Sequence, residues 1–167
     1  YLRCPIYATP FTMRIVRQKI ADKPWKYDVE LIEIPLSGAF KVGGFDLEYV
    51  TLTHSILEPN ALKIETPHGV VLHTGDWKID PDPMVGDVTD AKRLTEIGDK
   101  GVLALVCDST NVFNDGVAGS EKEVREELLK VMGNFSENRV TVACFASNVA
   151  RLETVAKVAA AHGRQVA

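Results

Sequence analysis

Two polar residues at the ends of apolar runs could take part in hydrolytic metal chemistry. His54 closes the run from Leu47 to Thr53, and Asp76 follows the run that begins at Val70. An imidazole and a carboxylate are side chains with which proteins bind the divalent metals that activate water. Each also has an ordinary alternative, because a histidine at a strand end is more often structural and an Asp after Gly often forms a turn.

The sequence between His54 and Asp76 predicts strands that bring the two residues close together. Residues 47–53 alternate with the period of a strand, and residues 61–66 predict a return strand. Pro67-His68-Gly69 predicts a turn, after which the chain runs back beside the return strand. Three passes of the chain therefore place His54 and Asp76 at one edge of a sheet.

A third candidate, Asp108, follows the continuous apolar run from Val102 to Cys107, which is typical of a strand buried on both faces. Residues 89–100 predict a helix that ends near Gly98 or Gly101. If this helix joins two parallel strands, Asp108 reaches the edge where α/β sheets gather ligands and catalytic groups. The alternative is a capping Asp in a loop.

A possible anion site lies at Ser147 and Asn148. They follow a predicted strand over residues 139–145 and precede a predicted helix over residues 149–162. The free amides at a helix start bind anions, so a phosphate could lie here. Simple helix capping by the same residues is the alternative. Arg151 could add a charge-assisted bond or be solvated.

The remaining elements predict an α/β fold. Thr9-Pro10 should open a helix, and Ser120-Glu121-Lys122-Glu123 has the pattern of a capping box that opens another. Further strands are expected at residues 2–7 and 27–34 and from Gln165 onward. The change near residues 108–119 from a sheet-rich region to strict α/β alternation predicts a domain boundary there.

Composition limits the classes of protein. The chain has 167 residues, 46% of them hydrophobic and 25% charged, and no apolar run approaches the length of a membrane span. The net charge of −4 argues against a generally basic nucleic-acid binder, although a local phosphate site stays possible. Cys4, Cys107 and Cys144 are far apart and lie in apolar runs, so we expect buried free thiols in a reducing, cytoplasmic compartment.

Four segments, with Pro5-Ile6-Tyr7-Ala8-Thr9-Pro10 upstream, stand in a characteristic order: Thr53-His54-Ser55-Ile56, His73-Thr74-Gly75-Asp76-Trp77-Lys78-Ile79-Asp80, Asp108-Ser109-Thr110-Asn111 and Phe145-Ala146-Ser147-Asn148-Val149. In order and spacing they resemble the ribonuclease J family, in the β-CASP branch of the metallo-β-lactamase superfamily. The resemblance covers nearly the whole chain. It implies part of a metallo-β-lactamase αββα sandwich over residues 1–107, followed by the start of a β-CASP domain over residues 108–167.

The resemblance also implies roles for individual residues. His54 would bind zinc, Asp76 would bridge two zinc ions and share in catalysis, and Asp108 would support the reacting site. Ser147 and Asn148 would help to hold the 5′-monophosphate of single-stranded RNA. The family implies a cytoplasmic exonuclease or endonuclease of RNA processing and decay, assembled as a homodimer or homotetramer without a membrane.

One part of the family pattern is absent. The main zinc motif, His-x-His-x-Asp-His, does not occur in the 167 residues. The chain begins at Tyr1 in mid-pattern and stops within a predicted strand, so we expect a piece of a longer protein. Since two zinc-binding side chains are fewer than the about four ligands that a closed site needs, we expect this piece alone to be inactive.

Three alternatives stay open. Another metallo-β-lactamase-fold hydrolase, such as a thioesterase, would lack the segments at Asp108 and Ser147. A non-catalytic phosphate- or nucleotide-binding module would ignore His54 and Asp76, and no glycine-rich phosphate-binding fingerprint follows any predicted strand. A degenerate structural homologue could have lost the first zinc motif.

Overall fold

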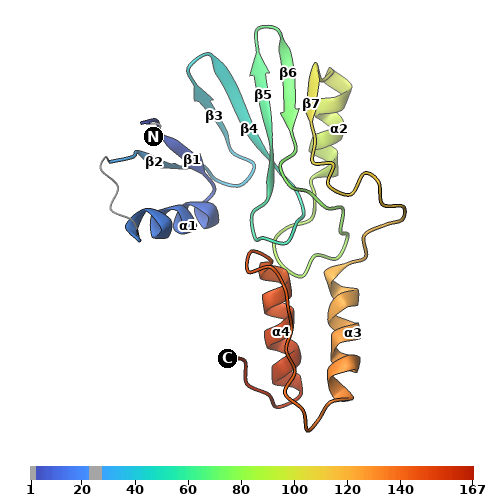
Figure 1. Cartoon of the computed structure of the whole chain (residues 1–167). Coiled ribbons are helices and arrows are strands. Elements are labelled where there is room, and N and C mark those ends of the chain that lie inside the picture. Colours follow the sequence, from blue (N-terminus) through green and yellow to red (C-terminus); the bar gives the residue numbers. More distant parts are fainter. Residues whose placement is uncertain (1–2, 23–27) are drawn as a thin grey trace. The chain divides into compact units, whose positions relative to one another are not determined.

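A computed structural model describes residues 3–22 and 28–167, and the chain divides into two compact units (Figure 1). Unit 1 comprises Tyr1–Thr51, Asn60–Gly75 and Asp90–Cys107, and unit 2 comprises Leu52–Pro59, Asp76–Thr89 and Asp108–Ala167. Helices and strands both occur, so the predicted α/β class is confirmed. The five candidate residues, His54, Asp76, Asp108, Ser147 and Asn148, all belong to unit 2.

The main sheet of unit 1 has five strands in the order β3-β4-β5-β6-β7. They are β3 (Ala39–Val42), β4 (Phe45–Thr51), β5 (Asn60–Thr66), β6 (Gly69–His73) and β7 (Ala104–Val106). β4 and β6 each pair with β5 in antiparallel register, so their carboxyl ends lie at the same edge of the sheet. This is the three-pass arrangement that the sequence predicted. Val50 and Ala61 of β4 and β5 are buried in the core.

The crossover between β6 and β7 is also confirmed. β7 pairs with β6 in parallel, with His73 opposite Val106. Helix α2 (Ala91–Lys100) connects them, begins at Asp90, whose carboxylate accepts from the Arg93 amide, and ends before Gly101. β7 was predicted to be buried on both faces, and this is wrong here. Its three residues, Ala104, Leu105 and Val106, are all exposed, because among the described elements β7 lies against β6 and no helix packs extensively on its faces.

A smaller parallel pair, β1 (Ile6–Ala8) and β2 (Leu31–Glu33), is joined through helix α1 (Pro10–Ala21). α1 begins at Thr9-Pro10 as predicted, because proline suits the first helical position. Both strands are shorter than predicted, and the predicted strand positions Leu2 and Tyr27 lie outside the described residues. β3 was not predicted, although the alternating Ala39-Phe40-Lys41-Val42 before a Gly-Gly turn was a usable signal.

Unit 2 contains the helices α3 (Glu121–Gly133) and α4 (Val149–Ala161), which lie side by side (Figure 1). The Ser120 capping box of α3 is present as predicted. The predicted strands at residues 139–145 and from Gln165 are wrong: both segments lack strand pairing. A strand needs a partner for its backbone groups, and the described residues supply none at either segment.

Two expectations about the surface have different outcomes. Cys4, Cys107 and Cys144 are free, as predicted, but exposed rather than buried. Cys107 follows the exposed edge strand and Cys144 lies in the unpaired segment, so the missing strand pairing accounts for both of these exposures. Among the described residues, no helix is long and apolar enough to cross a membrane.

Candidate functional site

The His54 loop is held by its neighbour Thr53, which is only 2% exposed. The Thr53 amide donates to the Thr89 hydroxyl at 2.9 Å, and the Thr89 amide donates to the Thr53 hydroxyl at 2.9 Å. Gly86 supports the same loop, because a Cβ there would lie 2.6 Å from the Leu57 carbonyl oxygen. His54 itself is half-buried, with Nδ1 3.2 Å from the Ser55 hydroxyl. The loop therefore presents the imidazole from a fixed backbone.

The loop that carries Asp76 is tied directly to the His54 loop. Gly75, with a φ of 61°, turns the chain out of β6, and Asp76 is exposed. The Lys78 amide then donates to the Thr53 carbonyl at 2.9 Å in an isolated antiparallel bridge. The residues beside His54 and Asp76 are thus joined by a backbone hydrogen bond.

Asp108 joins the same region through Trp77. The Trp77 indole N–H donates to the Asp108 carbonyl oxygen at 3.2 Å. The Asp108 carboxylate accepts from the Thr110 amide and hydroxyl at 2.9 and 2.6 Å. Asp108 therefore also caps the backbone of its own loop, which was the alternative interpretation of this residue. These Thr110 bonds are the largest cause that holds the pKa of Asp108 below its usual range, and the charge of His54 contributes further. The observed link between the Asp108 turn and the Asp76 loop is therefore the Trp77 hydrogen bond.

The start of α4 carries the two candidate anion-binding residues. Asn148 is the N-cap, and its side-chain oxygen accepts from the Arg151 amide at 2.8 Å, so the capping role is observed. Ser147 is exposed. The Ala150 amide donates to the Ser55 carbonyl at 3.2 Å. This bond joins the first turn of α4 to the residue that follows His54.

A buried carboxylate that sequence reasoning missed connects these segments. Asp80 is 3% exposed and accepts from the Asp82 amide at 3.0 Å and the Glu121 amide at 3.1 Å. Its carboxylate also lies 3.5 Å from Lys78 Nζ. Burial alone would raise the pKa of Asp80, but the two amides and Lys78 together hold it below its usual range. Asp80 ends the motif segment that begins at His73, but the local pattern predicts the reverse burial, since the neighbouring apolar Ile79 is 69% exposed.

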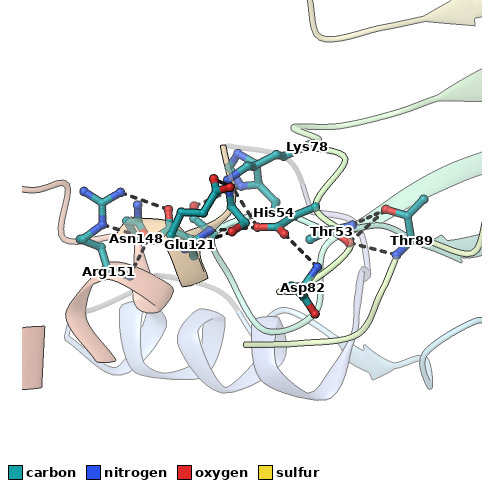
Figure 2. A network of polar contacts seen from close by, with 12 residues as sticks. Thr53, His54, Lys78, Asp82, Thr89, Glu121, Asn148 and Arg151 are labelled. Atoms are coloured by element: carbon teal, nitrogen blue, oxygen red, sulfur yellow. Dashed lines mark hydrogen bonds and ion pairs between the residues drawn. The ribbon is translucent and has the colours of Figure 1, made fainter. Parts of the chain in front are cut away.

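Arg151 forms an ion pair with Glu121. Its guanidinium donates to both carboxylate oxygens of Glu121 at 3.1 Å, the two-point geometry in which arginine binds carboxylates most strongly (Figure 2). Glu121 is the first residue of α3, and Arg151 lies in the first turn of α4. The pair thus joins the starts of the two helices.

The donors present fit part of a metal site. His54 offers an imidazole and Asp76 two carboxylate oxygens, which are ordinary zinc ligands. Within the part of the chain that the structure describes, no group of three or more His, Cys, Asp or Glu side chains could hold a metal ion. Among the described residues, His54 and Asp76 are therefore two possible metal donors without a further group of ligands around them.

Comparison with known proteins finds close sequence relatives. Ribonuclease J of Sinorhizobium meliloti is 45% identical over 165 residues, which cover 99% of this chain and 29% of that protein. Ribonuclease J of Corynebacterium glutamicum is 39% identical over 163 residues, covering 98% of this chain and 22% of that protein. The Thermus thermophilus protein of the same name is 36% identical over 167 residues. The chain spans less than a third of the length of these curated relatives.

A solved structure is similar in fold. A crystal structure of a protein of unknown function from Enterococcus faecalis V583 matches with a TM-score of 0.65 and 17% identity, over 95% of this chain and 41% of that one. No protein-family model matches the chain. The predicted resemblance is thus confirmed by sequence, and the structural match adds a likeness of fold.

Proposed function

Because the chain belongs to the ribonuclease J family along the segment that it spans, we propose that it forms part of a metal-dependent ribonuclease. The reaction is hydrolysis of RNA phosphodiester bonds, from the 5′ end, internally, or both. Residues 1–107 belong to the metallo-β-lactamase core and residues 108–167 to the start of the β-CASP domain. The protein acts in RNA processing and decay in the cytoplasm, as a homodimer or homotetramer.

In this proposal His54 and Asp76 bind a pair of zinc ions. Bound zinc would supply a water of lowered pKa and polarise the phosphate. His54 would hold zinc through a ring nitrogen, and Asp76 would hold it through its carboxylate. The Thr53 to Thr89 bonds fix the backbone beside His54 and so limit the positions of its ring. Since the described residues supply only two ligands, residues 1–167 alone should be inactive.

The other candidate residues act on the surroundings of the reaction. Asp108 would support the reacting site from a turn held by the Thr110 amide and hydroxyl, whose backbone carbonyl accepts from the Trp77 indole beside Asp76. Ser147 offers an exposed hydroxyl at the start of α4, where the helix dipole and free amides favour a negative charge. With Asn148 it would hold the 5′-monophosphate of a single-stranded RNA.

One observation carries the proposal: three segments distant in sequence meet at the His54 loop. The Lys78 amide, two residues after Asp76, and the Ala150 amide, two residues after Asn148, donate to carbonyls on either side of His54. The metal-binding and phosphate-binding candidates are therefore neighbours in one unit. A phosphodiesterase needs this combination of a metal site and an anion site, whereas a phosphate-binding module has no use for His54 and Asp76.

The test is Asp76→Ala in the full-length protein. We expect the variant to lose bound zinc and RNA cleavage together, because no other described residue replaces a bridging carboxylate. Asp82→Ala is the matched control: the Asp82 side chain is 64% exposed, and its carboxylate lies 3.4 Å from Lys122 Nζ. Metal content and cleavage of a 5′-monophosphorylated RNA are measured for both. Undiminished cleavage by Asp76→Ala, or a full reading frame without a His-x-His-x-Asp-His segment, would contradict the proposal.

A further inference from the structure

The polar contacts around the candidate site form a closed ring, and Figure 2 labels Thr53, Lys78, Glu121 and Arg151 among its members. From the His54 loop it passes through Lys78 to Asp80, then to the starts of α3 and α4, and returns to the His54 loop. Its members are Thr53, Lys78, Asp80, Glu121, Arg151, Ala150 and Ser55. All of them belong to unit 2. The ring therefore includes residues of the His54 loop, of the chain that follows Asp76 and of the start of α4.

Asp80 connects the chain that follows Asp76 to the start of α3. Its side chain is 2% exposed, and its two oxygens face different partners: Oδ1 accepts from the Asp82 amide and Oδ2 from the Glu121 amide. A buried carboxylate bonded to two amides cannot move without leaving donors unpaired in a poorly hydrated place. Asp80 therefore fixes the chain that follows Asp76 against the first turn of α3.

The ion pair between Glu121 and Arg151 connects the start of α3 to the start of α4. The side chains are 13% and 28% exposed, and each guanidinium contact measures 3.1 Å. The Glu121 amide is bonded to Asp80 while its carboxylate holds Arg151, so one residue faces both halves of the ring. Since Arg151 is three residues from the N-cap Asn148, the pair fixes the start of α4.

A second ion pair between the same helices offers a natural comparison. Arg125 of α3 and Glu153 of α4 lie 2.6 Å apart, and the Arg125 Nε–H also donates to Thr154. This pair joins α3 to α4 and, among the described residues, has no bond to Asp80 or to the His54 loop. A substitution in this pair should weaken the packing of α3 on α4 and leave intact the contacts that place the start of α4.

We propose that Glu121, anchored on Asp80, is a positioning residue that sets where the phosphate-binding start of α4 lies relative to the loops of His54 and Asp76. The inference rests on the proposed function, because it takes Ser147 and Asn148 as the anion site. It adds that the distance between the anion site and the metal site is set by this ion pair and not by the packing of α3 on α4. Selectivity for a 5′-monophosphate then depends on a residue that touches neither RNA nor metal.

The test compares Glu121→Gln with Glu153→Gln in the full-length protein. Each removes one charged partner of one α3 to α4 ion pair and keeps the shape of the side chain. Amide hydrogen exchange at Ala150 reports the bond to Ser55, and it does not depend on activity. We expect exchange at Ala150 to accelerate in Glu121→Gln and to match the wild type in Glu153→Gln. Arg151→Lys, which keeps the charge but loses the two-point contact, should also accelerate it.

The second readout is the ratio of kcat/KM for a 5′-monophosphorylated over a 5′-hydroxyl RNA. Glu121→Gln should lower this ratio roughly two- to thirtyfold, the range of coupling through packed networks, and Glu153→Gln should leave it unchanged. Equal Ala150 exchange in the two variants overturns the inference, and so does faster exchange with an unchanged ratio. If Ser147→Ala leaves the ratio unchanged, the proposed anion site is wrong, while the exchange comparison still decides whether the pair fixes α4.

Discussion

At the scale of single residues, hydroxyl groups beside His54 determine how firmly the imidazole is placed. The Thr89 hydroxyl accepts from the Thr53 amide and lies 3.1 Å from the Thr53 hydroxyl. Because Thr53 is buried, its amide has little access to water if this acceptor is removed. Thr89, which has no proposed contact with a ligand, thus helps to fix the backbone beside His54, the proposed zinc ligand.

The first prediction concerns this hydroxyl. Thr89→Val keeps the branched shape but leaves the Thr53 amide unsatisfied, so it should lower the free energy of unfolding by about 1–3 kcal/mol. Thr89→Ser keeps the hydroxyl and should cost less. Urea denaturation of the two variants measures the difference. Equal losses in Val and Ser variants would mean that the hydrogen bonds to Thr53 contribute little.

At the scale of elements, caps and pairing partners decide which predicted segments form. The Ser120 hydroxyl accepts from the Glu123 amide at 3.1 Å, and the Glu123 carboxylate accepts from the Ser120 amide at 2.8 Å. A helix start carries its own signal in this way, since both partners lie within one turn. Residues 139–145 carry the composition of a strand and still form none, because a strand depends on a distant partner.

The second prediction concerns the capping box of α3. Ser120→Ala removes the acceptor for the Glu123 amide and should cost about 0.5–2 kcal/mol of stability. Hydrogen exchange at the Glu121 amide, which donates to Asp80, should also become faster in this variant. Ser136→Ala, on the exposed turn after α3, is the control and should leave thermal unfolding unchanged. A Ser120 variant as stable as that control would contradict the capping role.

At the scale of the whole molecule, carboxylates with lowered pKa values make both units sensitive to acid. In unit 1 the hydrogen bond from Arg93 is the main cause that holds the pKa of Glu48 below its usual range. In unit 2 the pKa of Asp80 is lowered as well. A carboxyl group whose folded pKa is depressed stabilises the fold above its unfolded pKa, and this stabilisation is lost as pH falls through the folded pKa.

The third prediction is therefore a loss of stability below about pH 4, where unfolded Asp and Glu begin to protonate. Glu48→Gln and Asp80→Asn should each lower stability at pH 7 and flatten its decline toward acid. Asp46→Asn, which removes a carboxylate that is 58% exposed, should leave the pH dependence unchanged. Urea midpoints from pH 7 to pH 3 provide the measurement. A wild-type midpoint that does not fall with pH would refute the assignment.

The sequence by itself determined the local elements and the candidate residues. Period-two alternation and a turn predicted β4, β5 and β6, and the place of His54 and Asp76 at their ends followed from strand direction alone. The motif order identified the family, which the relatives confirm. These features could be predicted because each depends on residues close together in the chain or on a fixed series of types.

Only the tertiary structure decided which distant groups meet. It buried Asp80 while exposing Ile79, engaged Arg151 with Glu121, and left β7 at an open edge. It also brought Lys78 and Ala150 to either side of His54. Such outcomes depend on contacts between segments 25 or more residues apart, whose formation is set by the packing of whole elements and not by any local pattern.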